Sequence, residues 1–239
     1  MSDLIRRARA SGYEALCLTV DVPALGIRYR DIRSGIRGEF PSLKLLLDAA
    51  LHPRWSFPYL TGYRPRLANM DPYERAPRKG WLPLAAPELD PSFTWTDLEW
   101  VQSQWEGPLI VKGILDPDDA ERAFDLGAAA IVVSNHGGRQ LDAAPSPLSV
   151  LPRIREAVGP AAEIFADGGI TSGEDILKYL LAGANACFVG RAYLYGLAAR
   201  GSEGVEAVIA ILRRELELAM GLAGIAALNP RPGSSAVQP

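Results

Sequence analysis

The segment SNHGGRQLD, residues 134–142, places a histidine between an asparagine and two glycines, with an arginine three residues further on. Its His136 is one of only two histidines in the chain, and an imidazole exchanges a proton near neutral pH. The segment follows the apolar run AAAIVV, residues 128–133, which is typical of a buried strand. We therefore interpret His136 as a functional residue presented at the end of a strand.

Polar residues or glycines end four other apolar runs as well. Thr19 and Asp21 end the first run, Lys112 the second, the segment 167–169 (Asp-Gly-Gly) the fourth and Gly190-Arg191 the fifth. The carboxyl ends of parallel strands converge on one mouth in an α/β barrel, where active sites are built. Glycines that precede a helix leave backbone N–H groups for an anion, so the last two runs predict a phosphate site.

Strand-like and helix-like segments alternate along the chain, which predicts helices between the strands of a parallel α/β sheet. The strands read as continuously apolar and are therefore expected to be covered on both faces. The predicted strands are 15–20, 109–112, 130–134, 163–166 and 186–189, and the predicted helices are 117–126, 147–158, 173–182, one after Arg191, and 203–220.

The composition limits the classes of function. The net charge of −3 lacks the basic excess of a nucleic-acid-binding protein, so we expect no nucleic-acid partner. The sequence has no apolar run of about 18 residues and its start is not signal-like, which favours the cytoplasm. Cys17 and Cys187 stand in apolar runs and are expected to be buried hydrophobes. We expect no metal site.

A long insertion, 35–95, follows the first predicted strand. It is rich in proline and aromatic residues, and a solvated loop, a lid, a partner surface and a membrane surface remain alternatives for it. His52 is interpreted as a loop residue, and the segment 91–105 predicts a capped amphipathic helix. The Pro/Gly/Ser-rich end, 229–239, is expected to be a flexible tail.

Three stretches together resemble the FMN-dependent α-hydroxy acid dehydrogenase and oxidase family, which includes glycolate oxidase, L-lactate dehydrogenase and mandelate dehydrogenase. They are LTVDVPALGIRYRDIRSGI (18–36), PLIVKGILDPDDAERAFDLGAAAIVVSNHGGRQLD (108–142) and FADGGITSGEDILKYLLAGANACFVGRAYLYGLAARG (165–201). The resemblance covers nearly the whole chain except the tail. It implies a TIM (β/α)8-type barrel and FMN as the cofactor.

The resemblance also implies roles for individual residues. His136 resembles the catalytic base that takes a proton from the hydroxy acid, and Asp21 the group that stabilises the resulting imidazolium. Arg28 and Arg139 resemble the pair that binds the substrate carboxylate, for which a guanidinium is well suited. The implied cofactor-binding residues are Thr19, Lys112, Ser134, Asp167, Gly168, Gly169, Gly190 and Arg191.

The chain departs from the family pattern in two respects. Thr171 stands where the family usually has an arginine that reaches the phosphate. The resemblance begins just before the fourth of the eight strands of such a barrel, so the first three strands and a substrate-binding tyrosine are absent. We therefore expect an incomplete α/β barrel of about five strands, four to eight, over residues 1–228.

Three hypotheses for function follow. The leading one is FMN-dependent oxidation of a small L-2-hydroxy acid, of lactate or mandelate type, to the 2-keto acid, with His136 as base. The competing one is a truncated, non-catalytic remnant that acts as an assembly or binding piece. A third, a nucleotide dehydrogenase that uses cysteine, lacks its nucleophile because both cysteines fall within strands.

The resemblance is strongest to the lactate and mandelate dehydrogenase branch. It implies a quinone, a cytochrome or dioxygen as electron acceptor, and peripheral contact of the 35–95 insertion with the inner face of the cell membrane. A homo-oligomer is also expected.

Overall fold

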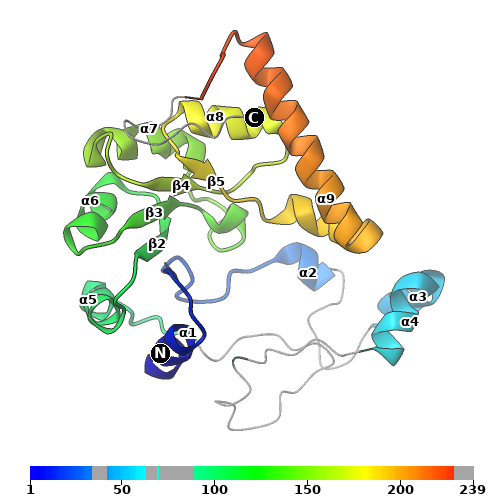
Figure 1. Ribbon diagram of the computed structural model, residues 1–239. Coiled ribbons are helices and arrows are strands. Elements are labelled where there is room, and N and C mark those ends of the chain that lie inside the picture. Colours follow the sequence, from blue (N-terminus) through cyan, green and yellow to red (C-terminus); the bar gives the residue numbers. More distant parts are fainter. Residues whose placement is uncertain (34–41, 63–68, 70–88, 229–239) are drawn as a thin grey trace. The chain divides into compact units, whose positions relative to one another are not determined.

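The computed structural model describes residues 1–33, 42–62, 69 and 89–228 (Figure 1). The chain divides into two compact units, residues 1–23 with 91–239 and residues 24–90. The predicted tail, 229–239, and about half of the predicted insertion, 35–95, lie outside the described residues.

Five parallel strands form the sheet of the first unit, and their order in space is their order in the chain. Each strand is thus added beside the preceding one, as in a (β/α)8 barrel, whereas the order reverses within a doubly wound sheet. All five strands were predicted from the sequence. They are β1 (Leu16–Thr19), β2 (Leu109–Ile114), β3 (Ala130–Val133), β4 (Ile164–Ala166) and β5 (Ala186–Cys187).

Helices connect these strands and begin where the sequence provides caps. Asp116 accepts a hydrogen bond from the Asp118 amide at the start of one helix, and Ser146 accepts one from the Ser149 amide at the start of another. The helices of the first unit are α1 (Ser2–Ala10), α5 (Trp95–Gln104), α6 (Pro117–Asp125), α7 (Pro147–Val158), α8 (Gly173–Leu181) and α9 (Arg191–Leu222), with the short 3₁₀ helix η2 (His136–Gly138) after β3.

The helix α9 has a break that divides it into the two helices predicted from the sequence. Arg200 leaves the helical conformation, and Gly201 has a φ of 61°, which favours glycine. The prediction of one helix after Arg191 and a second near 203–220 is therefore confirmed in substance.

The core of the first unit lies between one face of the sheet and the helices. Leu109, Val111, Ile131 and Ile164 come from three neighbouring strands, and each is 1% exposed or less. The helices contribute Ile5, Leu98, Val101, Ala120, Ala123, Leu151, Ile154 and Tyr179. Burial of these side chains fixes the strands whose ends carry the polar residues.

The expectation that every strand is covered on both faces holds for β3 but is wrong for β1. All four residues of β3 are buried, whereas Cys17 and Thr19 of β1 are exposed. In the described part of the chain, β1 pairs only with β2, so it is an edge strand. The prediction that Cys17 is a buried hydrophobe is therefore wrong. Burial raises the pKa of the half-buried Cys187 to about 12, which keeps this thiol protonated.

The second unit contains α2 (Tyr29–Arg33), α3 (Leu43–Leu51) and α4 (Pro53–Thr61). The helices α3 and α4 contact each other, and Ser56 of α4 donates a hydrogen bond to the Ala49 carbonyl of α3. His52 lies between them, as expected for a loop residue. Many of their apolar side chains are exposed, including Leu43, Leu46, Leu47, Leu51, Phe57 and Leu60. None of the helices in the described ranges is both long and apolar enough to cross a membrane.

Candidate active site

The turn that carries His136 has an unusual backbone. His136 has a φ of 56°, and Gly137 and Gly138 follow with 66° and 70°. Glycine adopts this left-handed region readily, but other residues are strained there, and such strain concentrates at functional sites. Asn135 closes the turn, because its Oδ1 accepts a hydrogen bond from the Gly138 amide at 3.3 Å. This explains why the histidine stands between an asparagine and two glycines.

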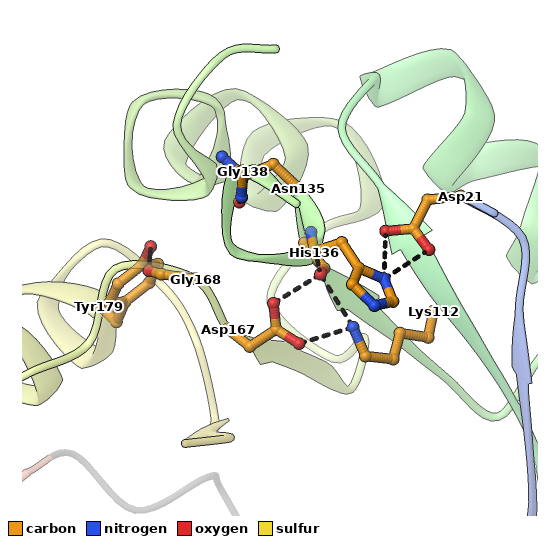
Figure 2. Close-up of polar contacts among 9 residues, drawn as sticks. Asp21, Lys112, Asn135, His136, Gly138, Asp167, Gly168 and Tyr179 are labelled. Carbon is orange, nitrogen blue, oxygen red and sulfur yellow. Dashed lines mark hydrogen bonds and ion pairs between the residues drawn. The ribbon is translucent and has the colours of Figure 1, made fainter. Parts of the chain in front are cut away.

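Asp21 and His136 point toward each other from the ends of β1 and β3 (Figure 2). Nδ1 of the imidazole lies 3.2 Å and 3.3 Å from the two carboxylate oxygens of Asp21. A carboxylate only accepts hydrogen bonds, so Nδ1 must carry the proton that it donates. In a neutral imidazole with this tautomer, the other ring nitrogen, Nε2, has its lone pair available to take a proton.

Gly113 makes room for this pair, a role that was not predicted from the sequence. A Cβ atom at this glycine would lie 2.6 Å from Cβ of Asp21, too close for any side chain. The glycine also has a φ of 113° at a register shift between β2 and β3. A glycine that interrupts an apolar strand after Lys112 was the available signal, since it often marks a bulge or a close backbone approach.

Lys112, Ser134 and Asp167 form a second cluster. Figure 2 shows Lys112 and Asp167 of this cluster beside His136. Nζ of Lys112 lies 2.6 Å from Oδ2 of Asp167 and donates a hydrogen bond to Oγ of Ser134 at 2.8 Å. The ammonium and the carboxylate are only 19% and 15% exposed, so each depends on the other for charge compensation. The ion pair and the hydrogen bond offset the free-energy cost of burying the lysine ammonium within the sheet.

Arg191 and the glycines after β4 and β5 lie at the other side of the site. Nη2 of Arg191 donates a hydrogen bond to the Gly137 carbonyl at 3.0 Å, which links the start of α9 to the histidine turn. A Cβ atom at Gly169 or at Gly190 would meet no other atom within 4 Å. The backbone therefore faces open space at both of these strand ends.

Tyr179 supports the glycine turn after β4 and was also missed from the sequence. Its hydroxyl donates a hydrogen bond to the Gly168 carbonyl at 2.7 Å, and burial raises the pKa of this hydroxyl to about 12. Gly168 is left-handed, and a Cβ there would lie 2.8 Å from Oδ1 of Asn135. The two turns thus approach each other closely. A tyrosine within a helix gave no sequence signal for this role.

Most of the predicted site residues line one cavity of about 880 Å³ in the first unit. Asp21 and Ser134 contact this group through His136 and Lys112. Thr19 is exposed and pairs in register with Lys112. Arg28 belongs to the second unit, so its role remains a prediction. The lining includes Lys112, His136, Arg139, Asp167, Gly168, Gly169, Thr171, Gly190 and Arg191.

Thr171 has a structural role of its own at the position where the family usually has arginine. Its amide and its hydroxyl both donate to Oδ2 of Asp175, within the cap of α8. Arg191 is a cationic residue that lines this cavity. Among the described residues, no ion pair joins Arg139 or Arg191 to a carboxylate.

The chain is similar to several flavoenzymes. Residues 1–232 match the model of the FMN-dependent dehydrogenase family. L-lactate dehydrogenase of Caulobacter vibrioides (strain NA1000 / CB15N) is 44% identical over 231 residues, which are 94% of this chain and 60% of that protein. The chain thus spans about 60% of the length of this relative.

Two solved structures have a related fold. The crystal structure of the monotopic membrane protein (S)-mandelate dehydrogenase superposes with a TM-score of 0.82 at 35% identity, over 96% of this chain and 62% of that one. A mandelate oxidase variant with a monooxide FMN adduct has a TM-score of 0.64 at 36% identity, over 93% and 54%. Since the family model matches nearly the full length, and the strand ends carry the expected residues, this chain belongs to the FMN-dependent dehydrogenase family.

Proposed function

We propose that this chain is the FMN-binding and proton-transferring part of an enzyme that oxidises a small L-2-hydroxy acid to the 2-keto acid. Its five strands would be strands four to eight of a (β/α)8 barrel. The observation that carries the proposal is the Asp21–His136 pair beside the Lys112–Asp167 pair, at one end of a parallel sheet. The similarity to L-lactate dehydrogenase and to (S)-mandelate dehydrogenase supports the substrate class.

The chemistry of the cavity fits FMN. Gly169 and Gly190 leave space where a side chain would otherwise stand, and Arg191 adds a cation at the first turn of α9. Backbone N–H groups at a helix start, together with a guanidinium, suit a phosphate. Lys112 uses two of its three N–H groups on Ser134 and Asp167, so the third is available to a cofactor oxygen. Bound FMN would supply an acceptor for the two electrons that leave the substrate.

The residues of this chain would handle the proton and the carboxylate. Nε2 of His136 takes a proton from the hydroxy acid, and Asp21 stabilises the imidazolium that results, because its carboxylate contacts Nδ1 directly. Arg139 follows His136 by three residues and lines the same cavity, so its guanidinium binds the substrate carboxylate. Arg28 is the proposed second carboxylate ligand.

The proposed partners follow from the same branch of the family. The electron acceptor is a quinone, a cytochrome or dioxygen. The cytoplasmic face of the cell membrane is the proposed location. The exposed leucines of α3 and α4 form the contact with the lipid, in line with the monotopic membrane relative. Self-association of the chain is proposed as well.

Anaerobic reduction of the bound flavin tests the oxidation directly. The full chain is loaded with FMN, and its absorbance near 450 nm is followed after addition of L-lactate or L-mandelate, with D-lactate as the control. Loss of absorbance with an L-acid alone supports the proposal. Retention of FMN without reduction by either L-acid favours the competing function, a non-catalytic assembly or binding piece.

A further inference from the structure

The hydroxyl of Ser134 has no remaining capacity for a cofactor hydrogen bond. Ser134 is fully buried, and its Oγ accepts hydrogen bonds from Nζ of Lys112 at 2.8 Å and from the amide of His136 at 3.0 Å. It also lies 2.5 Å from Oδ1 of Asp167. The ammonium and the amide can only donate, and the carboxylate can only accept, so the serine proton must go to Asp167. The one donor and both acceptor positions of the hydroxyl are therefore used.

The three partners come from three neighbouring strands or the turns that follow them (Figure 2). Lys112 belongs to β2, His136 follows β3 and Asp167 follows β4. The bond to the His136 amide is made by a residue in the left-handed region, a conformation that persists only where the surroundings hold it in place. One oxygen atom thus joins the strained turn of the histidine to the ion pair beside it.

We propose that Ser134 is a positioning residue, whose hydroxyl holds the His136 main chain and the Lys112–Asp167 pair in one geometry, and not a cofactor ligand. The inference deepens the proposed function and rests on it for the role of His136 as base. It leaves the third N–H of Lys112 and the unused acceptor positions of Asp167 as the groups of this cluster that contact the cofactor.

Hydrogen exchange at the His136 amide, in the full chain without FMN, tests the proposal. In Ser134→Ala this amide loses its acceptor, and we expect its protection to fall about tenfold or more. The imidazole resonances of His136 shift at the same time, whereas those of His52 do not. The matched control is Ser149→Ala, which removes an exposed hydroxyl that donates only within the first turn of α7. It leaves the His136 amide unchanged.

Unchanged protection in a folded Ser134→Ala chain overturns the proposal. If that variant does not fold, the unaltered chain decides the question, because its His136 amide must already exchange slowly and must stay protected when FMN is added. Exchange at the rate of an unstructured amide, or release of protection by FMN, contradicts the assignment.

Steady-state turnover separates a positioning role from a purely structural one, because a purely structural role would not change kcat selectively. In a chain that oxidises L-lactate, Ser134→Ala lowers kcat with little change in KM, because it disturbs the base and leaves substrate contacts in place. Equal effects of Ser134→Ala and Ser149→Ala on kcat contradict the proposal. Absence of FMN binding and of turnover in the unaltered chain overturns the proposed function, and the amide measurement still decides the role of Ser134.

Discussion

Leu151 on α7 and Leu47 on α3 are the same residue in the same kind of secondary structure, with opposite surroundings. Leu151 is fully buried between the helices and the sheet of the first unit, whereas Leu47 is 58% exposed. In the first unit, helices of the same unit cover the apolar side chains of the sheet that form the core. The second unit leaves four leucines of one nine-residue helix exposed. This difference supports the proposals that the first unit holds a polar site at its strand ends and that the second unit contacts an apolar partner.

The two histidines give the largest expected difference between the units. His136→Gln removes the base, and we expect flavin reduction by L-lactate to slow about 10²–10⁴-fold, the usual contribution of a general base. His52→Gln is the control, since this side chain is exposed between α3 and α4. Stopped-flow absorbance measures both rates. Similar rates for the two variants would mean that His136 is not the base.

The two leucines test the difference in packing. Leu151→Ala leaves a cavity and should lower the free energy of unfolding by about 2–5 kcal/mol. Leu47→Ala removes an exposed side chain and should change it by less than about 0.5 kcal/mol. Urea unfolding followed by circular dichroism measures both values. A large loss of stability in Leu47→Ala would show that α3 is covered in the folded chain.

Lipid binding tests whether the exposed leucines of the second unit contact a membrane. Replacement of Leu43 and Leu47 by serine should weaken co-sedimentation with phosphatidylcholine vesicles about tenfold or more, because apolar surface no longer enters the lipid. The control replaces Leu218 and Leu222 of α9, which have the same spacing and are also exposed. If both pairs have the same effect, the second unit is not the specific lipid contact.

Replacement of Asp175 is expected to have a smaller effect on stability than Leu151→Ala, and this effect depends on pH. Burial alone raises its pKa, but hydrogen bonds from Thr171, Lys178 and Ser172 outweigh it, and the net pKa is lowered. The ionised carboxylate therefore stabilises the fold above its unfolded pKa, and this contribution is lost as pH falls through the lowered folded pKa.

We expect Asp175→Asn to be less stable than the unaltered chain by about 0.5–2 kcal/mol at pH 7, the usual contribution of a helix cap. The difference should shrink as the pH falls into the range where Asp175 is protonated. Asp48→Asn, in the second unit, is the control. Urea midpoints from pH 7 to pH 2 provide the measurement, and a gap of constant size would exclude ionisation as its origin.

The sequence predicted the strands and most of the helices of the first unit, because each has a clear apolar pattern and a cap. It also predicted that His136, Arg139 and Lys112 lie at one mouth, since the ends of parallel strands converge. It did not predict the roles of Gly113 and Tyr179. Their positions depend on the close approach of Asp21 to β2 and of α8 to the Gly168 turn, and neither distance is encoded in a local pattern.

The exposure of Cys17 has a similar origin. An apolar run predicts a strand but does not say whether a neighbouring strand covers both of its sides. Because β1 pairs on one side only among the described residues, alternate side chains of this strand remain exposed.

Titration of the chain with FMN, followed through the side-chain resonances of its two histidines, tests the central claim that the strand ends of the first unit form the flavin site. We expect the signals of His136 to shift and to saturate at one equivalent of FMN, while those of His52 stay in place. Absence of binding, or movement of the His52 signals with none at His136, would contradict it.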